Sequence, residues 1–135
     1  MYKIIAYLVF LTALASAAVR YTAVNEQTNG NQFRHEHLSN EPVGSEFIKV
    51  MEEAQKENPE KFRFEAIEYE WGKMIVEING VRANGQDRTF WGFLREEESS
   101  LCMMRTGVST YKIKKDEHLY MKFLTFDDRY PQCKD

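Results

Sequence analysis

The chain has 135 residues, a formal net charge of −3 and a hydrophobic content of 43%. Its basic residues are scattered among the acidic ones, which argues against nucleic acid or an anionic membrane as a partner. No stretch beyond the amino terminus is long and apolar enough for a membrane span.

The amino terminus has the pattern of a secretory signal peptide. Lys3 precedes an apolar run from Ile4 to Leu14, and the small residues Ala15-Ser16-Ala17 resemble a cleavage site. We therefore expect residues 1–17 to be removed and residues 18–135 to form a single domain. The mature protein is expected to be secreted and extracellular.

The two cysteines of the chain are Cys102 and Cys133. In an oxidising compartment they are expected to form a disulfide bond. We expect this bond within one chain, with a covalent dimer as the alternative.

Two short β-prone segments come first in the mature chain, Val19–Val24 and a weaker one around Phe33–Leu38. Residues 46–57 then predict the principal helix, with Ser45 as its N-cap and Glu46 in its first turn. Pro59 is expected to end it. Apolar residues recur at i, i+3, i+4 and i+7 and form one stripe, which consists of Phe47, Val50, Met51 and Ala54.

After the helix the apolar pattern changes to a period of two, which indicates strands. Phe62 and Phe64 are expected on one face, and Ile67, Tyr69 and Trp71 on the opposite one. The parity switches near Ala66, which indicates a β-bulge or a bend there. The predicted fold is α+β and mostly β, with one helix packed on antiparallel sheets. The remaining predicted elements are strands at Met74–Ile78, Thr89–Leu94, Val108–Ile113 and Leu119–Phe126, and a polar loop at Glu96–Ser100.

Motifs for catalysis or metal binding are weak in this sequence. His35 and His37 would share a face of a strand, but no third ligand stands at a suitable spacing, so we predict no metal site. These histidines and His118 are expected at solvated positions. No nucleophile elbow, phosphate-binding glycine loop or zinc-protease motif is present. We therefore predict a protein that is not an enzyme and requires no cofactor.

The segment GQDRTFWGFL, residues 85–94, carries an excess of aromatic side chains. On a strand, Phe90 and Leu94 would face one side and Trp91 and Phe93 the other. A small two-layer domain needs only one of these faces for its core, so the other is expected to contact a ligand or a partner. Both tryptophans of the chain precede a glycine, where a ligand can approach the backbone.

Several stretches in the same order resemble the carboxy-terminal β-domain of the cobalamin carriers, the intrinsic factor, transcobalamin and haptocorrin family. The shared features are a helix that ends near Asn-Pro, a Phe-x-Phe strand, Trp-Gly, an aromatic-Trp pair and a Gly-Val-x-x-Tyr segment. The likeness extends over about residues 20–126. It is carried by MEEAQKENPEKFRFE, EWGKMIVEINGVRANGQDRTFWGFL and TGVSTYKIKKDEHLYMKF.

The resemblance implies a fold and a function: a transcobalamin-like domain for cobalamin (corrinoid) binding and transport. In the carriers, cobalamin lies between this domain and a helical domain that has no counterpart here. The resemblance therefore implies a half-site that acts alone or with a separately encoded helical partner or a receptor. The matching carrier segments contribute to the ligand surface, which implies ligand-binding roles for Trp71, Gly72, Lys73, Met74, Ile75, Trp91, Gly92, Phe93 and Leu94.

Two departures from the carriers stand beside this likeness. The loop after Leu94 looks longer, and it brings Cys102, so the bond to Cys133 would be an addition to the family pattern.

The alternative function is a secreted module that has lost cobalamin and binds a protein or another small ligand with the same face.

Overall fold

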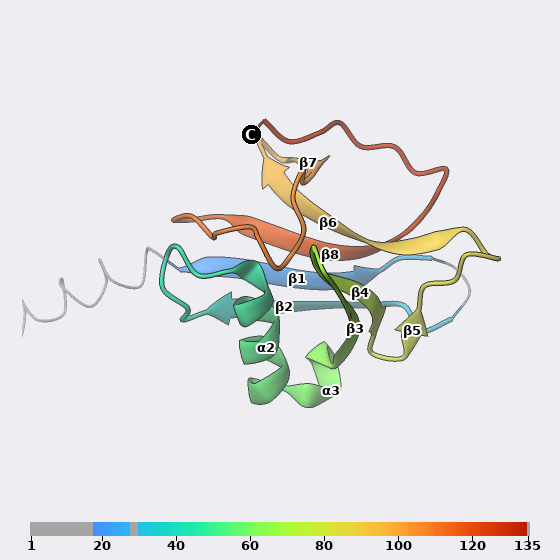
Figure 1. The fold of residues 1–135 in the computed structure, drawn as a ribbon, viewed down its shortest axis with the longest axis horizontal. Coiled ribbons are helices and arrows are strands. Elements are labelled where there is room, and N and C mark those ends of the chain that lie inside the picture. Colours follow the sequence, from blue (N-terminus) through green and yellow to red (C-terminus); the bar gives the residue numbers. More distant parts are fainter. Residues whose placement is uncertain (1–17, 28–29, 135) are drawn as a thin grey trace, which may run out of the picture.

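Residues 18–27 and 30–134 are described in a computed structural model of the chain, so the predicted signal peptide lies outside the described residues. Two β-sheets and one principal helix make up the fold (Figure 1). The larger sheet has the strand order β2-β1-β8-β6-β7 and the smaller one the order β3-β4-β5. The strands are β1 (Val19–Asn25), β2 (Phe33–Ser39), β3 (Phe64–Tyr69), β4 (Gly72–Ile78), β5 (Val81–Arg82), β6 (Thr89–Glu97), β7 (Ser100–Met103) and β8 (His118–Thr125).

The predicted class, α+β and mostly β, is confirmed, but the larger sheet is mixed rather than antiparallel. Strands β1 and β8 run parallel, with Tyr21 opposite Leu119. The other paired strands of both sheets are antiparallel. A parallel pair needs a long connection, and here nearly the whole domain lies between the two strands.

Helix α2 (Phe47–Glu57) confirms the predicted principal helix, but its start differs from the prediction. The N-cap is Glu46 instead of Ser45, and no side chain caps the helix. The N–H groups of Phe47 and Ile48 instead donate to the carbonyls of Tyr111 and Val108, each at 2.9 Å. The first N–H groups of the helix are thus bonded by a segment that is distant in the sequence, and not by the predicted local side-chain cap.

Pro59 does more than end this helix, because it begins a second one, α3 (Pro59–Phe62). Proline is well suited to the first position of a helix, where its missing N–H leaves no bond unmade. The period of two suggests that Phe62 and Phe64 lie on one strand. Phe62 lies instead on the short helix α3, and only Phe64 lies on β3.

The predicted apolar stripe of α2 packs against one face of the larger sheet. Phe47 stacks on Phe93 with ring centroids 4.6 Å apart and meets Tyr21 edge to face at 5.4 Å. All members of the stripe are fully buried, namely Phe47, Val50, Met51 and Ala54. The prediction of the helix face is confirmed.

A β-bulge lies where the parity of the sequence switches. Glu65 pairs with Glu77 while Ala66 pairs with Ile75, which leaves Val76 as the extra residue of β4. The bulge lets Ile75 and Ile78 both reach the main core although three positions separate them. The predicted bulge near Ala66 is confirmed.

Two predicted elements after β6 are wrong. Residues 108–113 form turns and a single bridge between Lys112 and Glu46, not a strand. The polar loop expected at residues 96–100 is a tight hairpin, because β6 continues to Glu97 and β7 begins at Ser100. Its two turn residues, Glu98 and Ser99, have φ angles of 50° and 69°, as a two-residue hairpin turn requires.

Strand β6 is covered on both faces. Trp91 and Phe93 point into the main core with α2. Phe90 and Leu94 belong to a second apolar cluster on the opposite face of the sheet, which also contains Val24, Leu101, Met103, Tyr120, Leu124 and Tyr130. The expectation that one face of this strand stays free for a ligand is therefore wrong. Residues from β7 and the carboxy-terminal tail complete the second cover.

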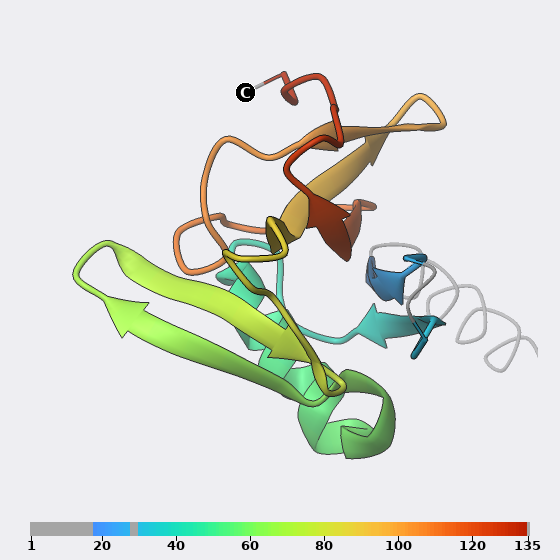
Figure 2. The same ribbon diagram turned by 90° about the vertical axis from the view of Figure 1, so that its right-hand side faces the viewer.

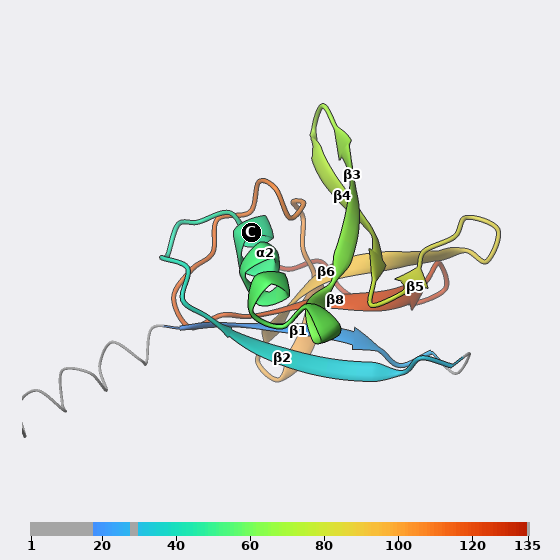
Figure 3. The same cartoon turned by 90° about the horizontal axis from the view of Figure 1, so that it is seen from below.

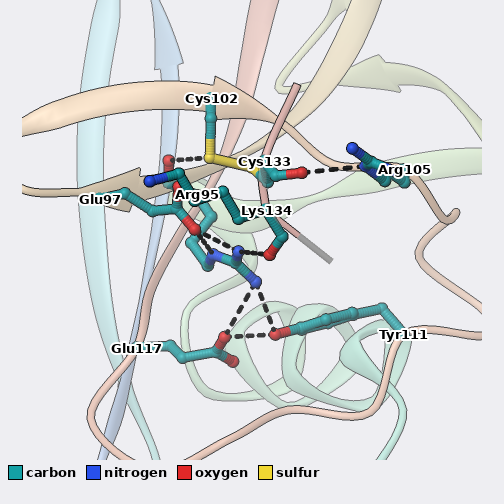
Figure 4. A network of polar contacts seen from close by, with 8 residues as sticks. All are labelled: Arg95, Glu97, Cys102, Arg105, Tyr111, Glu117, Cys133 and Lys134. Atoms are coloured by element: carbon teal, nitrogen blue, oxygen red, sulfur yellow. Dashed lines mark hydrogen bonds and ion pairs between the residues drawn. A yellow bond between two sulfur atoms is a disulfide. The ribbon is translucent and has the colours of Figure 1, made fainter. Parts of the chain in front are cut away.

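The tail is held in place by a disulfide bond and by a buried arginine (Figure 4). Cys102 and Cys133 are bonded within the chain, which confirms the predicted pairing. The guanidinium of Arg95 donates to the carbonyl of Lys134 at 3.0 Å and pairs with the carboxylate of Glu97. Among the described residues, no helix has the length and apolar character needed to cross a membrane.

The same arginine also contacts Tyr111, whose hydroxyl donates to the carboxylate of Glu117 (Figure 4). Burial, together with this hydrogen bond, raises the pKa of Tyr111 to about 12. The network thus joins β6, the connection before β8 and the tail.

Candidate ligand-binding surface

The β3–β4 hairpin projects away from the larger sheet, and its tip stands clear of the body (Figures 2 and 3). Large apolar side chains are concentrated on it. Trp71 is 60% exposed, and Ile67, Tyr69 and Met74 are each about 40% exposed. Such a concentration of exposed apolar residues is typical of a binding surface and not of an ordinary solvated hairpin.

The pairing of the two strands places these side chains together. Ile67 lies directly opposite Met74, and Tyr69 lies opposite Gly72, so these positions share one face. The ring of Trp71, in the turn, stacks on Tyr69 with centroids 5.1 Å apart and an interplanar angle of 6°. We call Ile67, Tyr69, Trp71 and Met74 the hairpin surface.

An apolar groove of about 310 Å³ adjoins the hairpin surface. Met74 belongs to both, and Phe90, Trp91 and Phe126 line the far side of the groove. Phe126 is 44% exposed. The hairpin surface and the groove share Met74, and both contain aromatic side chains.

Charged side chains flank the hairpin surface and pair with one another. Lys73 lies 3.6 Å from Glu68, and Arg82 bridges Glu65 and Glu77 at 2.9 and 3.3 Å. These pairs are exposed, so they contribute little to stability.

The residues predicted to bind a ligand fall into two groups. Trp71 and Met74 are exposed on the hairpin, and Gly72 and Lys73 are partly exposed beside them. The others are buried in the body: Ile75, Trp91, Gly92, Phe93 and Leu94. The fold brings Met74, Ile75 and Trp91 together at the groove.

Trp91 has the surroundings of a core residue. It is 7% exposed, and its indole N–H donates to the carbonyl of Val81 at 2.9 Å. Its ring packs against Phe33 and Phe123. It is accessible to a ligand only where it lines the groove.

Both glycines that follow a tryptophan are explained by packing within the chain. A Cβ on Gly92 would lie 2.6 Å from the Leu124 side chain, and one on Gly72 would lie 3.0 Å from Ser109. Gly72 also has a φ of +131°, which favours glycine, and the hydroxyl of Ser109 accepts the N–H of Lys73. Close approach of this chain's own side chains, rather than of a ligand, accounts for these glycines.

Several surface residues were not among the predicted ligand contacts. Ile67 and Tyr69 share the face of Trp71 by simple alternation, so the period-two pattern could have identified them. Phe90 and Phe126 carry no such local signal, because the pairing of β6 with β8 is what places them at the groove.

The histidines are less solvated than predicted. His37 and His118 are each 8% exposed, which corrects the expectation of solvated positions. His118 bonds to Thr22 at 2.6 Å, and His37 bonds to Glu53 at 2.7 Å. His35 stacks on Phe33. The pKa of His35 is lowered mainly by burial and to a smaller extent by the positive charge of Lys61.

Comparisons with known proteins agree with this architecture. The human cobalamin binding intrinsic factor is 32% identical over 117 residues, which cover 85% of this chain and 27% of that protein. Human transcobalamin-1 is 38% identical over 80 residues, which cover 59% of this chain and 18% of that protein. The chain thus spans about a quarter or less of the length of these relatives.

Solved structures extend the likeness to three dimensions. The structure of haptocorrin in complex with Cbi matches this chain with a TM-score of 0.61 and 30% sequence identity. The match covers 82% of this chain and 25% of the haptocorrin chain. A 9% identical protein from Ruminococcus gnavus shares the fold over 81% of this chain and 97% of its own, with a TM-score of 0.56. The model of the family described as "Domain of unknown function (DUF4430)" matches residues 44–125. The chain therefore belongs to this DUF4430 family, and it resembles the carboxy-terminal β-domain of the cobalamin carriers.

Proposed function

We propose that the chain is a secreted protein that binds a corrinoid, with cobalamin as the candidate ligand, and takes part in cobalamin transport. The names of its relatives, intrinsic factor and transcobalamin-1, support a cobalamin ligand. The signal-peptide pattern and the intrachain disulfide support secretion. The relatives are binding proteins by name, which supports a function other than catalysis.

The observation that carries the proposal is the hairpin surface with its adjoining groove. A corrin ring is a broad apolar disc with amide groups at its edge, so its site needs apolar contact area and a few hydrogen-bonding groups. The stacked pair of Tyr69 and Trp71 supplies a flat aromatic contact, and Met74 supplies an adaptable one. Among the described residues, β3 is an edge strand of its sheet, and its outer edge offers backbone N–H and C=O groups to the amides.

This surface covers one side of a disc-shaped ligand. Such a half-site meets most of the entropic cost of association while it gains only part of the contacts. We therefore expect micromolar affinity or weaker, about 8 kcal/mol or less. A helical partner chain or a receptor that covers the second side would raise the affinity.

The second candidate function is a module that has kept the fold and lost cobalamin. The burial of Ile75 and of Trp91, Gly92, Phe93 and Leu94 favours it, because packing alone accounts for these residues. The hairpin surface would then contact a protein or another small apolar molecule.

A titration with cobalamin tests the proposal. Purified mature protein is titrated while corrin absorbance and tryptophan fluorescence are recorded. Binding should quench the fluorescence of the exposed Trp71 and follow a one-to-one curve with a micromolar midpoint. If neither signal changes, the protein does not bind cobalamin, and the second candidate function is favoured. Nanomolar binding by a monodisperse monomer would contradict the half-site.

A further inference from the structure

A histidine and two carboxylates meet between strand β2 and helix α2, and none of them belongs to the hairpin surface or the groove. His37, on β2, places its Nε2 atom 2.7 Å from Oε1 of Glu53, on α2. Glu57 follows one helical turn later. One ligand atom from each of these residues lies within 4.8 Å of the other two. We call His37, Glu53 and Glu57 the His37 cluster.

The placement of the two carboxylates is electrostatically unfavourable by itself. Glu53 and Glu57 are four positions apart on one helix, and like charges at this spacing repel. Glu57 is also the last residue of α2, where the helix dipole disfavours negative charge. Among the described residues, neither carboxylate forms an ion pair with a lysine or arginine, and only His37 pairs with Glu53. A cation among the three groups would relieve both penalties.

The donor set suits a divalent transition-metal ion. An imidazole nitrogen with two carboxylate oxygens is a ligand combination that zinc accepts, and water completes its coordination. The backbone N–H of Asn40 donates to Oε2 of Glu53 at 3.1 Å, which orients this carboxylate as outer hydrogen bonds do at metal sites.

The geometry allows such an ion with small movements. Tetrahedral coordination needs ligand atoms about 3.4 Å apart, so Glu57 must move inward and His37 must separate slightly from Glu53. Glu57 is exposed and free to change its rotamer. An open groove of about 530 Å³, lined by Glu53 and Glu57, gives an ion and its waters access.

We infer that His37, Glu53 and Glu57 form a binding site for a divalent transition-metal ion, with Zn²⁺ as the probe of choice. The ligands are Nε2 of His37 and one oxygen of each carboxylate. No further ligands for His37 are apparent in the sequence, because Glu53 and Glu57 are distant from it along the chain. They come close to His37 only through the packing of α2 on β2. This site is independent of corrinoid binding.

The experiment uses tag-free mature protein, titrated with Zn²⁺ in a calorimeter and, in parallel, with Co²⁺ under visible absorption. Wild-type protein should bind one ion, and the Co²⁺ spectrum should show its coordination by protein ligands. Glu57→Gln should weaken Zn²⁺ binding about tenfold or more. Because Glu57 is exposed, this variant should fold, which circular dichroism verifies.

Glu52→Gln is the matched control. Glu52 lies on the same helix and lines the same groove, but it pairs with Lys49 and stands outside the His37 cluster. It should leave the affinity unchanged within about twofold. Equal losses in the two variants, or no binding by the wild type, would overturn the inference and leave an ordinary ion pair between His37 and Glu53.

Discussion

The side chain of Leu124 lies directly over Gly92, on the face of the larger sheet that points away from α2. A Cβ on Gly92 would come within 2.6 Å of Cδ1 of Leu124. The two residues belong to the neighbouring strands β6 and β8. The missing side chain of Gly92 thus makes room for a fully buried leucine of the second apolar cluster.

Replacement of this glycine should therefore destabilise the protein. Gly92→Ala should lower the free energy of unfolding by about 1–3 kcal/mol, because the methyl group overpacks a filled space. In a Leu124→Ala background the same change should cost less than about 1 kcal/mol, since the two sites are in contact and their effects are coupled. Urea denaturation of the four proteins measures both values. Equal costs in the two backgrounds would show that Leu124 is not the reason for the glycine.

Trp91 should behave as a core residue in stability measurements. Trp91→Ala should lower the free energy of unfolding by about 3–5 kcal/mol, because a large cavity remains between Phe33 and Phe123. Trp91→Phe should cost less, because it keeps most of the buried aromatic volume although it loses the hydrogen bond to Val81. A loss below about 1 kcal/mol for the alanine variant would be that of a surface residue and would contradict the observed burial.

Trp71 should give the opposite pattern. Trp71→Ala should change stability by about 1 kcal/mol or less, because the side chain is largely exposed. Cobalamin binding should weaken by about 2 kcal/mol or more, as for an anchor residue of an interface. Leu38→Ala is the matched control: Leu38 is also 60% exposed but lies on β2, away from the hairpin surface. If both variants bind as well as the parent, the proposed ligand surface is wrong.

The disulfide bond should stabilise the fold by restricting the unfolded chain. Cys102 and Cys133 are 31 positions apart, and closing a loop of this size is worth about 3–4 kcal/mol in the chain-entropy treatment. The double variant Cys102→Ser with Cys133→Ser should lose about this amount in urea denaturation. Non-reducing electrophoresis of the wild type should show a monomer. A predominant band of twice the mass would contradict the intrachain bond.

Stability should fall under mildly acidic conditions because of His118. Burial, and next the charge of Arg20, lowers the pKa of His118, and these effects outweigh the carboxylates of Glu36 and Glu96. The unfolded chain accepts this proton near pH 6.5, whereas the folded chain accepts it only at lower pH. In that window the unfolded state binds more protons, so the free energy of unfolding decreases as the pH falls from about 7 towards 5.

The variant His118→Gln isolates this contribution. Its free energy of unfolding should decrease less steeply over the same window, whatever its absolute stability. The free energy of unfolding of the variant should still depend on pH, because the pKa of His35 is also lowered by burial. Urea denaturation of the wild type and the variant at several pH values measures both pH dependences. An identical dependence in the two proteins would contradict the role of His118.

Features that depend on neighbouring residues were predictable from the sequence. The helix at residues 47–57 and its buried stripe follow from a 3.6-residue period, which any helix must bury on one side. The sequence indicated the bulge near Ala66, although its extra residue, Val76, lies on the partner strand β4. The disulfide partners followed from a chain that has only two cysteines.

Periodicity states which side chains share a face, but it does not state what covers that face. Only the tertiary structure decided that α2 covers the face of β6 that carries Trp91, while β7 and the tail cover the opposite face. The hairpin surface remained exposed. The same reason explains residues 108–113, whose carbonyls accept the first N–H groups of α2 instead of pairing in a strand. It also explains the His37 cluster, whose members become neighbours through the packing of a helix on a sheet, a long-range contact that no local pattern encodes.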